Sequence, residues 1–439
     1  MKLEDLKNKN ILILGFEKEG MSSLNFFRRI FPKKVIGIGD RKDIKNLKPK
    51  INNLLKKDKR IKLHFGKDYL KTLKNYDLIV KSPGIPPKVI KSFLRKKQRV
   101  TSQTEIFFEN CPGKIIGVTG TKGKSTTSSL IYKVLKDNGL KVNLIGNIGK
   151  PALSFLLSAK KNNIYVFELS SHQLLGLSKS PQIAVLLSIY PEHLDYYKNF
   201  NEYVRAKANI TKYQTKRDFL IFNSENRIVN KIAKKSKAKK LPLKSVKIKK
   251  IESALKGDFN LQKLKAVILV GRIFSLKDKE ILKAIKKFKP LPHRLEYVGT
   301  FKGIKFYNDA LSTIPETTIA ALDTLGNNVQ TIFLGGFDRG ISFTNLAKRL
   351  LQSKIRNLIL FPTTGERIWR EILRQDQDKC HKAILVSNMR DGVKMAYKLT
   401  QKGKICLLST ASPSFSLFKD YKEKGNLFKK YVKRYGKSN

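Results

Sequence analysis

The stretch Ile115-Ile-Gly-Val-Thr-Gly-Thr-Lys-Gly-Lys-Ser-Thr126 determines how the chain can fold. An apolar, β-branched run ends in a glycine-rich turn. A helical pattern follows, with an apolar stripe formed by Leu130, Ile131, Val134 and Leu135. A turn of this kind presents backbone N–H groups at a helix N-terminus, where phosphate binds readily. The sequence therefore predicts a phosphate-binding loop within an α/β unit.

The residues of this loop fit nucleotide chemistry. Lys124 can reach the β- and γ-phosphates, and the Ser125 hydroxyl can bind Mg²⁺. The Walker A spacing is not met, because Val118 stands where the first glycine belongs, and Gly120 and Gly123 bracket a tighter loop. The alternative is an ordinary strand-to-helix turn with a chance Gly-Lys-Ser. We favour the phosphate loop, because strand, glycines, lysine and helix occur in the required order.

Composition limits the classes of partner. The net charge is +57, from 91 Lys+Arg against 34 Asp+Glu, which would suit a nucleic acid or an anionic membrane. The alternative is a general lysine bias, which we favour because lysine is scattered along the whole chain and arginine is rarer. The densest basic run, residues 231–250, then reads as a surface excursion. The three cysteines form no paired motif, and we expect a cytoplasmic protein with no signal peptide, no membrane partner and no specific nucleic-acid partner.

Strands alternate with helices on both sides of the loop, and this alternation predicts parallel sheets with ligands at the carboxyl ends of the strands. Near the N-terminus, a buried strand runs into the turn at residues 15–20, where Glu17 replaces the middle glycine of a dinucleotide fingerprint. Asp40 ends the next strand and could bind a ribose or uracil, and residues 82–87 follow a third strand. These loops could be ordinary turns, but we favour a single anion-binding edge.

Two acidic motifs follow the phosphate loop. Glu168 ends an otherwise apolar strand, where a carboxylate costs free energy unless it is paired or metal-bound, and Mg²⁺ is its natural partner beside a phosphate loop. The alternative is a strand-end glutamate that faces solvent. His193 and Asp195 could contact a metal or water, although a lone histidine is more often simply hydrogen-bonded. A third α/β unit is expected after residue 304. It is preceded by a polar, basic segment with little pattern at 225–256, a helical stretch at 257–287 and a linker at 290–296.

Taken together, several motifs resemble the Mur ligases, and within them the branch that adds glutamate. The resemblance covers essentially the whole chain and rests on residues 119–126, 146–149, 168–173, 192–195, 291–294, 308–309, 334–336, 408–415 and 418–426. It implies three α/β domains. These are a Rossmann-like UDP-substrate-binding domain at 1–103, a central phosphate-loop ATPase-like domain with a mostly parallel sheet at 104–290, and a C-terminal Rossmann-like amino-acid-binding domain at 291–439.

The resemblance also implies a reaction. The enzyme would use ATP and two Mg²⁺ ions to add glutamate to UDP-N-acetylmuramoyl-L-alanine through an acyl-phosphate intermediate. This reaction belongs to peptidoglycan precursor synthesis, and the enzyme would be a monomer. D-glutamate is the usual substrate of the branch. L-glutamate stays open, because residues 310–314 read Ala-Leu-Ser-Thr-Ile where the family commonly has Ser-Lys-Ala-Thr-Asn. A different Mur ligase, a folylpolyglutamate synthetase and a nucleic-acid-binding ATPase also stay open at this point.

The family's functional positions map onto this chain residue by residue. The catalytic positions are Lys124, Glu168, His193 and Lys207. The Mg²⁺ positions are Ser125 and Glu168 for one ion, and His193 and a carbamylated Lys207 for the other. The nucleotide positions are Gly120, Thr121, Lys122, Gly123, Lys124, Ser125, Thr126, Asn147, Asn260, Arg294 and Asp309. The substrate positions are Asp40, Ser170, Gln173, Thr313, Arg339, Ser414 and Tyr421. The chain departs from the family at Lys122 and Lys263, which stand where asparagine is usual, and at Lys18 and Glu19 in the first glycine turn.

Overall fold

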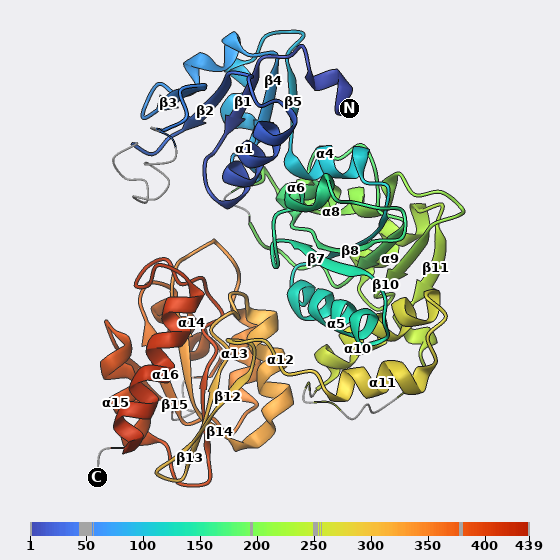
Figure 1. The fold of residues 1–439 in the computed structure, drawn as a ribbon. Helices are drawn as coiled ribbons and strands as arrows, with labels where there is room; N and C mark the ends of the chain where they lie inside the picture. The colour runs from blue at the N-terminus through green and yellow to red at the C-terminus, as the bar shows by residue number, and fades with distance from the viewer. Residues whose placement is uncertain are drawn as a thin grey trace. The chain divides into compact units, whose positions relative to one another are not determined.

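The computed structural model describes residues 2–43, 55, 57–193, 196–248, 253, 255, 257–376 and 381–437. It contains three sheets, each flanked by helices, so the predicted three-domain α/β class is confirmed (Figure 1). The chain divides into two compact units. One comprises Met1–Tyr190, Tyr196–Lys249 and Lys263–Ile285, and the other comprises Pro191–Asp195, Lys250–Gln262 and Lys286–Asn439.

The first sheet has the strand order β3-β2-β1-β4-β5, and all its pairs are parallel. Its strands are β1 (Ile11–Leu14), β2 (Ile36–Asp40), β3 (Ile61–Phe65), β4 (Leu78–Lys81) and β5 (Arg99–Thr101). Helices α1 (Lys18–Ile30) and α3 (Pro87–Ile90) accompany it. Helix α4 (Gln103–Asn110) follows β5 but packs against the second sheet, where Phe107 contacts Tyr165 and Phe167. Strand β1 is buried on both faces, which explains its unbroken apolar sequence. The chain turns outward in opposite directions from β1 and β4, so their carboxyl ends form a topological switch point.

The second sheet has the order β11-β10-β9-β6-β8-β7 and is also parallel. Its strands are β6 (Lys114–Thr119), β7 (Val142–Gly146), β8 (Ile164–Glu168), β9 (Ile183–Leu186), β10 (Phe219–Phe222) and β11 (Lys239–Pro242). The helices around it are α5 (Lys124–Asp137), α6 (Leu153–Leu156), α7 (Ser171–Leu174), α8 (Phe200–Lys212) and α9 (Arg227–Lys235), followed by α10 (Asp258–Ile273) and α11 (Asp278–Lys286). Helix α5, which follows the phosphate loop, packs against β7 and β8.

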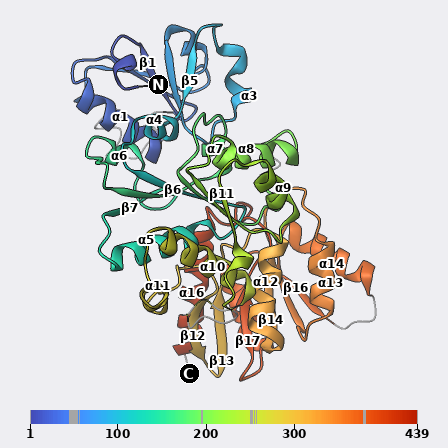
Figure 2. The same ribbon diagram turned by 90° about the vertical axis from the view of Figure 1, so that its right-hand side faces the viewer.

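The third sheet has the order β12-β13-β17-β14-β15-β16, with only β12 and β13 antiparallel among its described pairs. Its strands are β12 (Glu296–Phe301), β13 (Ile304–Asn308), β14 (Val329–Gly335), β15 (Asn357–Phe361), β16 (Lys382–Leu385) and β17 (Ile405–Leu408). Alternate residues of its strands pack against different helices. One face carries α12 (Pro315–Leu325), α13 (Thr344–Leu351) and α14 (Thr364–Gln375), and the other carries α15 (Met389–Leu399) and α16 (Tyr421–Lys437). Figure 2 labels α12, α13, α14 and α16 beside this sheet.

Three sequence expectations need correction. The segment 225–256 has more regular structure than its weak pattern indicated, because it contains α9, whose Val229 and Ile232 enter the core, and the edge strand β11. The basic run at 231–250 is therefore partly regular structure, although residues 249 and 250 lie outside the described residues. The helical stretch at 257–287 is two helices, α10 and α11, and β12 already begins at Glu296 at the end of the expected linker. Among the described residues, no helix is long and apolar enough to cross a membrane.

Candidate active site

The predicted phosphate loop connects β6 to α5, as the sequence indicated. Gly120 has φ 149° and Gly123 has φ 89°. Residues with a Cβ atom rarely adopt these backbone angles. A Cβ atom on Gly120 would lie 2.7 Å from Cβ of Leu187, and one on Gly123 would lie 3.0 Å from Cε of Lys263. Both positions therefore require glycine for conformation and for space. The first turn of α5 directs its backbone N–H groups into this loop, where an anion would be stabilised.

Two lysines converge on one oxygen of the loop. The Lys124 ammonium lies 3.0 Å from the Gly120 carbonyl and 2.7 Å from that of Thr121. The Lys207 ammonium, from α8, lies 2.8 Å from the same Gly120 carbonyl. Two positive charges this close repel each other by a few kcal/mol at a typical protein dielectric. The arrangement therefore favours a bound anion, or neutralisation of one of the two amines.

The environment of Lys207 separates it from the many surface lysines. Its side chain is 1% exposed, and its ammonium lies 4.7 Å from the centre of the Tyr203 ring. The Tyr203 hydroxyl lies 3.0 Å from the Thr121 hydroxyl, which in turn lies 3.0 Å from the Tyr190 carbonyl. Lys207 is therefore not a solvated surface lysine. Helix α8 instead delivers a buried amine to the phosphate loop.

Glu168 ends β8 next to the loop. In the β-sheet register it pairs with Val118 of β6 on one side and with Gly146 of β7 on the other. The side chain is 3% exposed, and its buried Oε2 atom has no hydrogen-bond partner among the described residues. The alternative of a solvent-facing carboxylate is therefore wrong. The backbone N–H of Asn147 donates a hydrogen bond to the backbone carbonyl of Glu168 (3.2 Å), which brings this predicted nucleotide-binding residue to the same edge of the sheet.

This edge fits a divalent cation of the hard, oxygen-binding kind. A buried carboxylate oxygen without a protein donor is costly, and Mg²⁺ would satisfy it. Among the described residues, no cluster of three or more His, Cys, Asp and Glu side chains forms a complete metal centre. Mg²⁺ usually takes only one or two carboxylates and completes its shell with phosphate oxygens and water. The buried Ser125 hydroxyl and Glu168 would suit such a partial site.

Lys263 is a loop neighbour whose position the sequence did not indicate. It is buried, and the end of its aliphatic stem packs against Gly123, so it accompanies Lys122, Lys124 and Lys207 at the loop. Lys122, Thr121 and Thr126 lie in the loop or in the first turn of α5 as expected, with both threonines buried.

The predicted amino-acid residues gather in the second unit around a buried acid. The Thr313 hydroxyl lies 3.3 Å from Oε1 of Glu192, and the Arg339 guanidinium lies 3.9 Å from the same oxygen. His193 lies 3.7 Å from the other oxygen of Glu192 and adopts a left-handed backbone conformation, with φ 59°. Glu192 was part of a recognised motif but had no predicted role. The structure makes it the common neighbour of three predicted site residues. Asp195 lies outside the described residues.

The other predicted site residues of the second unit include several at or after the carboxyl ends of the strands of the third sheet. Asp309 accepts hydrogen bonds from the Ser409 hydroxyl (2.9 Å) and the Leu295 amide (3.0 Å), so it organises the strand ends. The Ser414 side chain is 4% exposed, and its hydroxyl has no partner among the described residues, which leaves it suited to a ligand. Tyr421 begins α16, and its ring centre lies 5.9 Å from that of His293. Arg294 follows His293, and Asn260 lies in the first turn of α10.

The predicted substrate residues of the first unit all make structural hydrogen bonds. Asp40 accepts from the Phe16 amide (2.6 Å) and the Lys42 amide (2.9 Å), and so holds the first glycine turn. Ser170 and Gln173 form a capping box at the N-terminus of α7. The Gln173 amide nitrogen also donates to Glu19 (2.8 Å). These residues shape the loops at the strand ends, and their substrate roles stay predictions.

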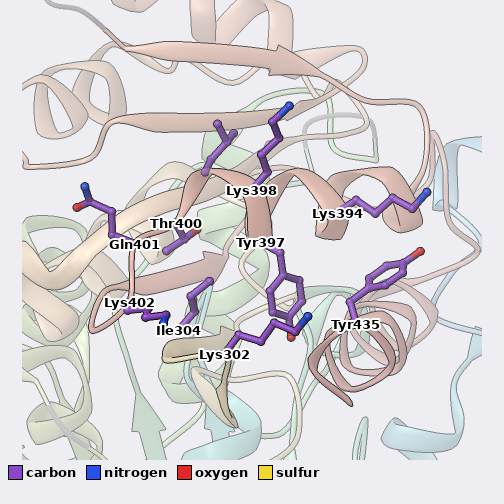
Figure 3. Close-up of a pocket in the computed structure, with 10 residues that line it drawn as sticks. Lys302, Ile304, Lys394, Tyr397, Lys398, Thr400, Gln401, Lys402 and Tyr435 are labelled. Atoms are coloured by element: carbon purple, nitrogen blue, oxygen red, sulfur yellow. The ribbon is translucent and has the colours of Figure 1, made fainter. Parts of the chain in front are cut away.

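A separate hollow of about 680 Å³ lies in the third domain, lined by Lys302, Lys394, Lys398, Lys402, Tyr397 and Tyr435, among others (Figure 3). It reaches the first residue of β13, Ile304, whereas Asp309 follows the last. The hollow is therefore at the opposite edge of the sheet from the candidate site. Its lysines are exposed, as most lysines of this chain are.

Known proteins resemble the chain in sequence and in fold. Residues 118–284 match the Mur ligase middle domain. The UDP-N-acetylmuramoylalanine--D-glutamate ligase of Acetivibrio thermocellus is 32% identical over 457 residues, which covers 97% of each chain. The ligase of the same name from Clostridium tetani is 32% identical over 452 residues, again with 97% of each covered. The crystal structure of MurF ligase from Thermotoga maritima in complex with ADP has a TM-score of 0.59 at 17% identity, covers 97% of this chain and 95% of that one, and supports the fold alone.

The fold and the loop define a three-domain α/β protein with the strand–loop–helix unit of phosphate-loop proteins. The identity to relatives over nearly their whole length makes the assignment specific: the chain belongs to the Mur ligase family.

Proposed function

We propose that the protein is an ATP-dependent ligase that joins D-glutamate to UDP-N-acetylmuramoyl-L-alanine in peptidoglycan precursor synthesis. The identity to D-glutamate ligases over 97% of the chain supports this substrate pair. The observation that carries the chemistry is the convergence of Lys124 and Lys207 on the Gly120 carbonyl, beside the buried Glu168 carboxylate. Phosphoryl transfer needs positioning and charge neutralisation of this kind more than it needs a protein nucleophile.

The reaction would proceed in two displacements. The alanine carboxylate of the UDP-linked substrate attacks the γ-phosphorus of ATP, and ADP leaves. The glutamate amine then attacks the acyl carbon, loses a proton, and inorganic phosphate leaves. Lys124 and the amides of the first turn of α5 would stabilise the charge on the transferring phosphoryl group, since positive groups placed there in advance lower the barrier.

Magnesium would be held by residues of the same edge and by His193. Ser125 and Glu168 would bind one ion, and His193 and a carbamylated Lys207 the second. Carbamylation converts an ammonium, which repels Mg²⁺, into an anionic oxygen ligand, and it would also remove the repulsion between Lys207 and Lys124. The ions would supply neutralisation of phosphate charge.

The remaining predicted residues would hold the substrates. Arg339 can grip one carboxylate of glutamate with two parallel hydrogen bonds. The Ser414 hydroxyl would bind the other carboxylate, with Thr313 and Tyr421 completing the pocket. Asn147, Asn260, Arg294 and Asp309 would serve ATP, and Asp40, Ser170 and Gln173 the UDP-linked substrate. We propose that the enzyme works as a monomer with domains at 1–103, 104–290 and 291–439.

The test supplies ATP, Mg²⁺ and UDP-N-acetylmuramoyl-L-alanine with either pure enantiomer of glutamate, and measures product by mass and phosphate release by colorimetry. We expect product with D-glutamate and phosphate release that depends on both substrates. Faster ligation of L-glutamate would overturn the choice of enantiomer but not the chemistry. Phosphate release stimulated by DNA or RNA, with no amide product, would overturn the proposed function.

A further inference from the structure

The switch point of the first sheet carries a loop, residues 82–85, whose backbone carbonyl groups accept hydrogen bonds from other side chains of the protein. Lys81 ends β4, and its ammonium lies 2.7 Å from the Ile85 carbonyl and 3.1 Å from the Ser82 carbonyl. The Ser82 hydroxyl donates to the Gly15 carbonyl (2.8 Å), which joins this loop to the turn after β1. Residues 82–85 and the first glycine turn thus form one edge.

A second donor reaches the same loop from a distant part of the sequence. The Tyr196 hydroxyl lies 2.9 Å from the Pro83 carbonyl and 3.2 Å from the Ile85 carbonyl. Burial raises the pKa of Tyr196 to about 12, so the hydroxyl keeps its proton at neutral pH. Lys81 and Tyr196 therefore share the Ile85 carbonyl as an acceptor.

Two residues of helix α7, in the central domain, contact the members of this hydrogen-bond network. The His172 ring centre lies 4.0 Å from that of Tyr196, so α7 supports the tyrosine. One residue further on, Gln173 donates to Glu19 of α1 (2.8 Å), and the Glu19 carboxylate lies in the field of Lys81. Helix α7 is thus connected to the loop at residues 82–85 through Tyr196, and to the first glycine turn through Glu19.

The physical consequence concerns the sign of the charge that the loop presents. Carbonyl oxygens carry partial negative charge and repel an anion, whereas backbone N–H groups attract one. Lys81 and Tyr196 bind the carbonyls of Ser82, Pro83 and Ile85, three of the four in residues 82–85. A loop whose carbonyls are occupied in this way is prepared for an anionic ligand at the strand ends, where ligands of open α/β sheets bind.

We propose that Lys81 and Tyr196 are positioning residues for the diphosphate-bearing substrate, which act by binding the carbonyl groups of residues 82–85 and fixing this loop against helix α7. The inference rests on the proposed function, because it takes the anion to be the diphosphate of UDP-N-acetylmuramoyl-L-alanine.

The test compares Tyr196→Phe and Lys81→Met with wild type in steady-state ligation, with each of the three substrates varied in turn. Tyr196→Phe keeps the ring against His172 and removes only the hydroxyl. We expect the KM for the UDP-linked substrate to rise about tenfold in each variant, the size of one lost hydrogen bond to a charged or polar group. The KM values for ATP and glutamate should stay within about twofold. Because the two residues share an acceptor, the double variant should lose less than the product of the single effects.

Matched controls are Tyr213→Phe, at the exposed end of α8, and Lys88→Met, on the exposed surface of α3. Thermal unfolding and calorimetric binding of the UDP-linked substrate accompany the kinetics. Lower melting temperatures with an unchanged KM and unchanged binding would make the network merely structural and overturn the inference. Equal rises in all three KM values would also overturn it. Absence of ligation by the wild-type enzyme would instead refute the proposed function.

Discussion

Replacing Glu168 by glutamine should make the magnesium-free protein more stable while destroying its activity. The Glu168 carboxylate is almost fully buried, and its Oε2 atom has no donor among the described residues. Leaving a buried polar group unsatisfied costs about 1–3 kcal/mol, and more when the group is charged. Glutamine has nearly the same shape and no charge, although its amide still leaves a polar atom buried there. The expected gain of about 1–3 kcal/mol in EDTA therefore comes only from removing the charge, which costs more to bury than a neutral polar group. For a domain of this size, each kcal/mol raises the melting temperature by roughly 2–4 °C.

The assay is calorimetric unfolding in EDTA and again with Mg²⁺ and ADP, alongside ligation rates. Wild type should gain stability from the added ligands, because they bind the folded state only. The variant should gain much less stability from these ligands. It should also turn over at least about 100-fold more slowly, because it lacks the carboxylate that would hold the Mg²⁺ ion, whose positive charge neutralises the transferring group. Glu280→Gln, on the exposed side of α11, controls for the general effect of removing one negative charge from this basic chain. A variant that is less stable than wild type in EDTA, yet responds fully to Mg²⁺, would refute the reasoning.

Three further outcomes are expected. Lys124→Ala should lose at least about 1,000-fold in turnover with its circular dichroism unchanged, because this ammonium offsets charge on the transferring group; near-normal turnover in a folded variant would contradict the loop assignment. Lys207→Ala should be inactive and should recover partly with acetate, which can replace a carbamate oxygen, and full activity without acetate would rule out the metal role. Burial lowers the pKa of Lys81 from 10.5 to about 8, so its charged form is disfavoured in the folded state. The contribution of Lys81 to stability should therefore rise as pH increases from about 8 to 10.5, and urea unfolding of Lys81→Met should show a smaller rise than wild type over that range, whereas equal slopes would contradict the shift.

The parts of the fold that the sequence revealed share one property. Strands such as β1 and β8 are buried on both faces, so they appear as short apolar runs that end in a turn. The edge strands β3 and β11 were missed for the opposite reason. Strand β11 reads Lys-Lys-Leu-Pro, and lysine and proline are residues that protect an exposed sheet edge from pairing with other chains. In a chain with so many lysines, such an edge looks like a loop.

The candidate site divides along similar lines. The loop glycines, Lys124 and Glu168 could be predicted because their neighbours in sequence determine their positions. The shared acceptor of Lys124 and Lys207 could not, since it depends on how α8 packs beside β6. The position of Glu192 beside Arg339 and Thr313 likewise depends on contacts between segments more than 100 residues apart.

The short segment Pro191–Asp195 has a consequence for how this protein can be divided. It belongs to the same compact unit as the C-terminal domain, although it lies some hundred residues before that domain begins. A fragment cut at residue 286 would leave the largely buried Arg339 guanidinium without the Glu192 carboxylate that neutralises it. Losing one partner of such a buried ion pair costs more than the pair contributes. A recombinant C-terminal fragment should therefore be less soluble and less stable than the same residues in the intact chain, and ligand-binding studies of the proposed amino-acid site require the full-length protein.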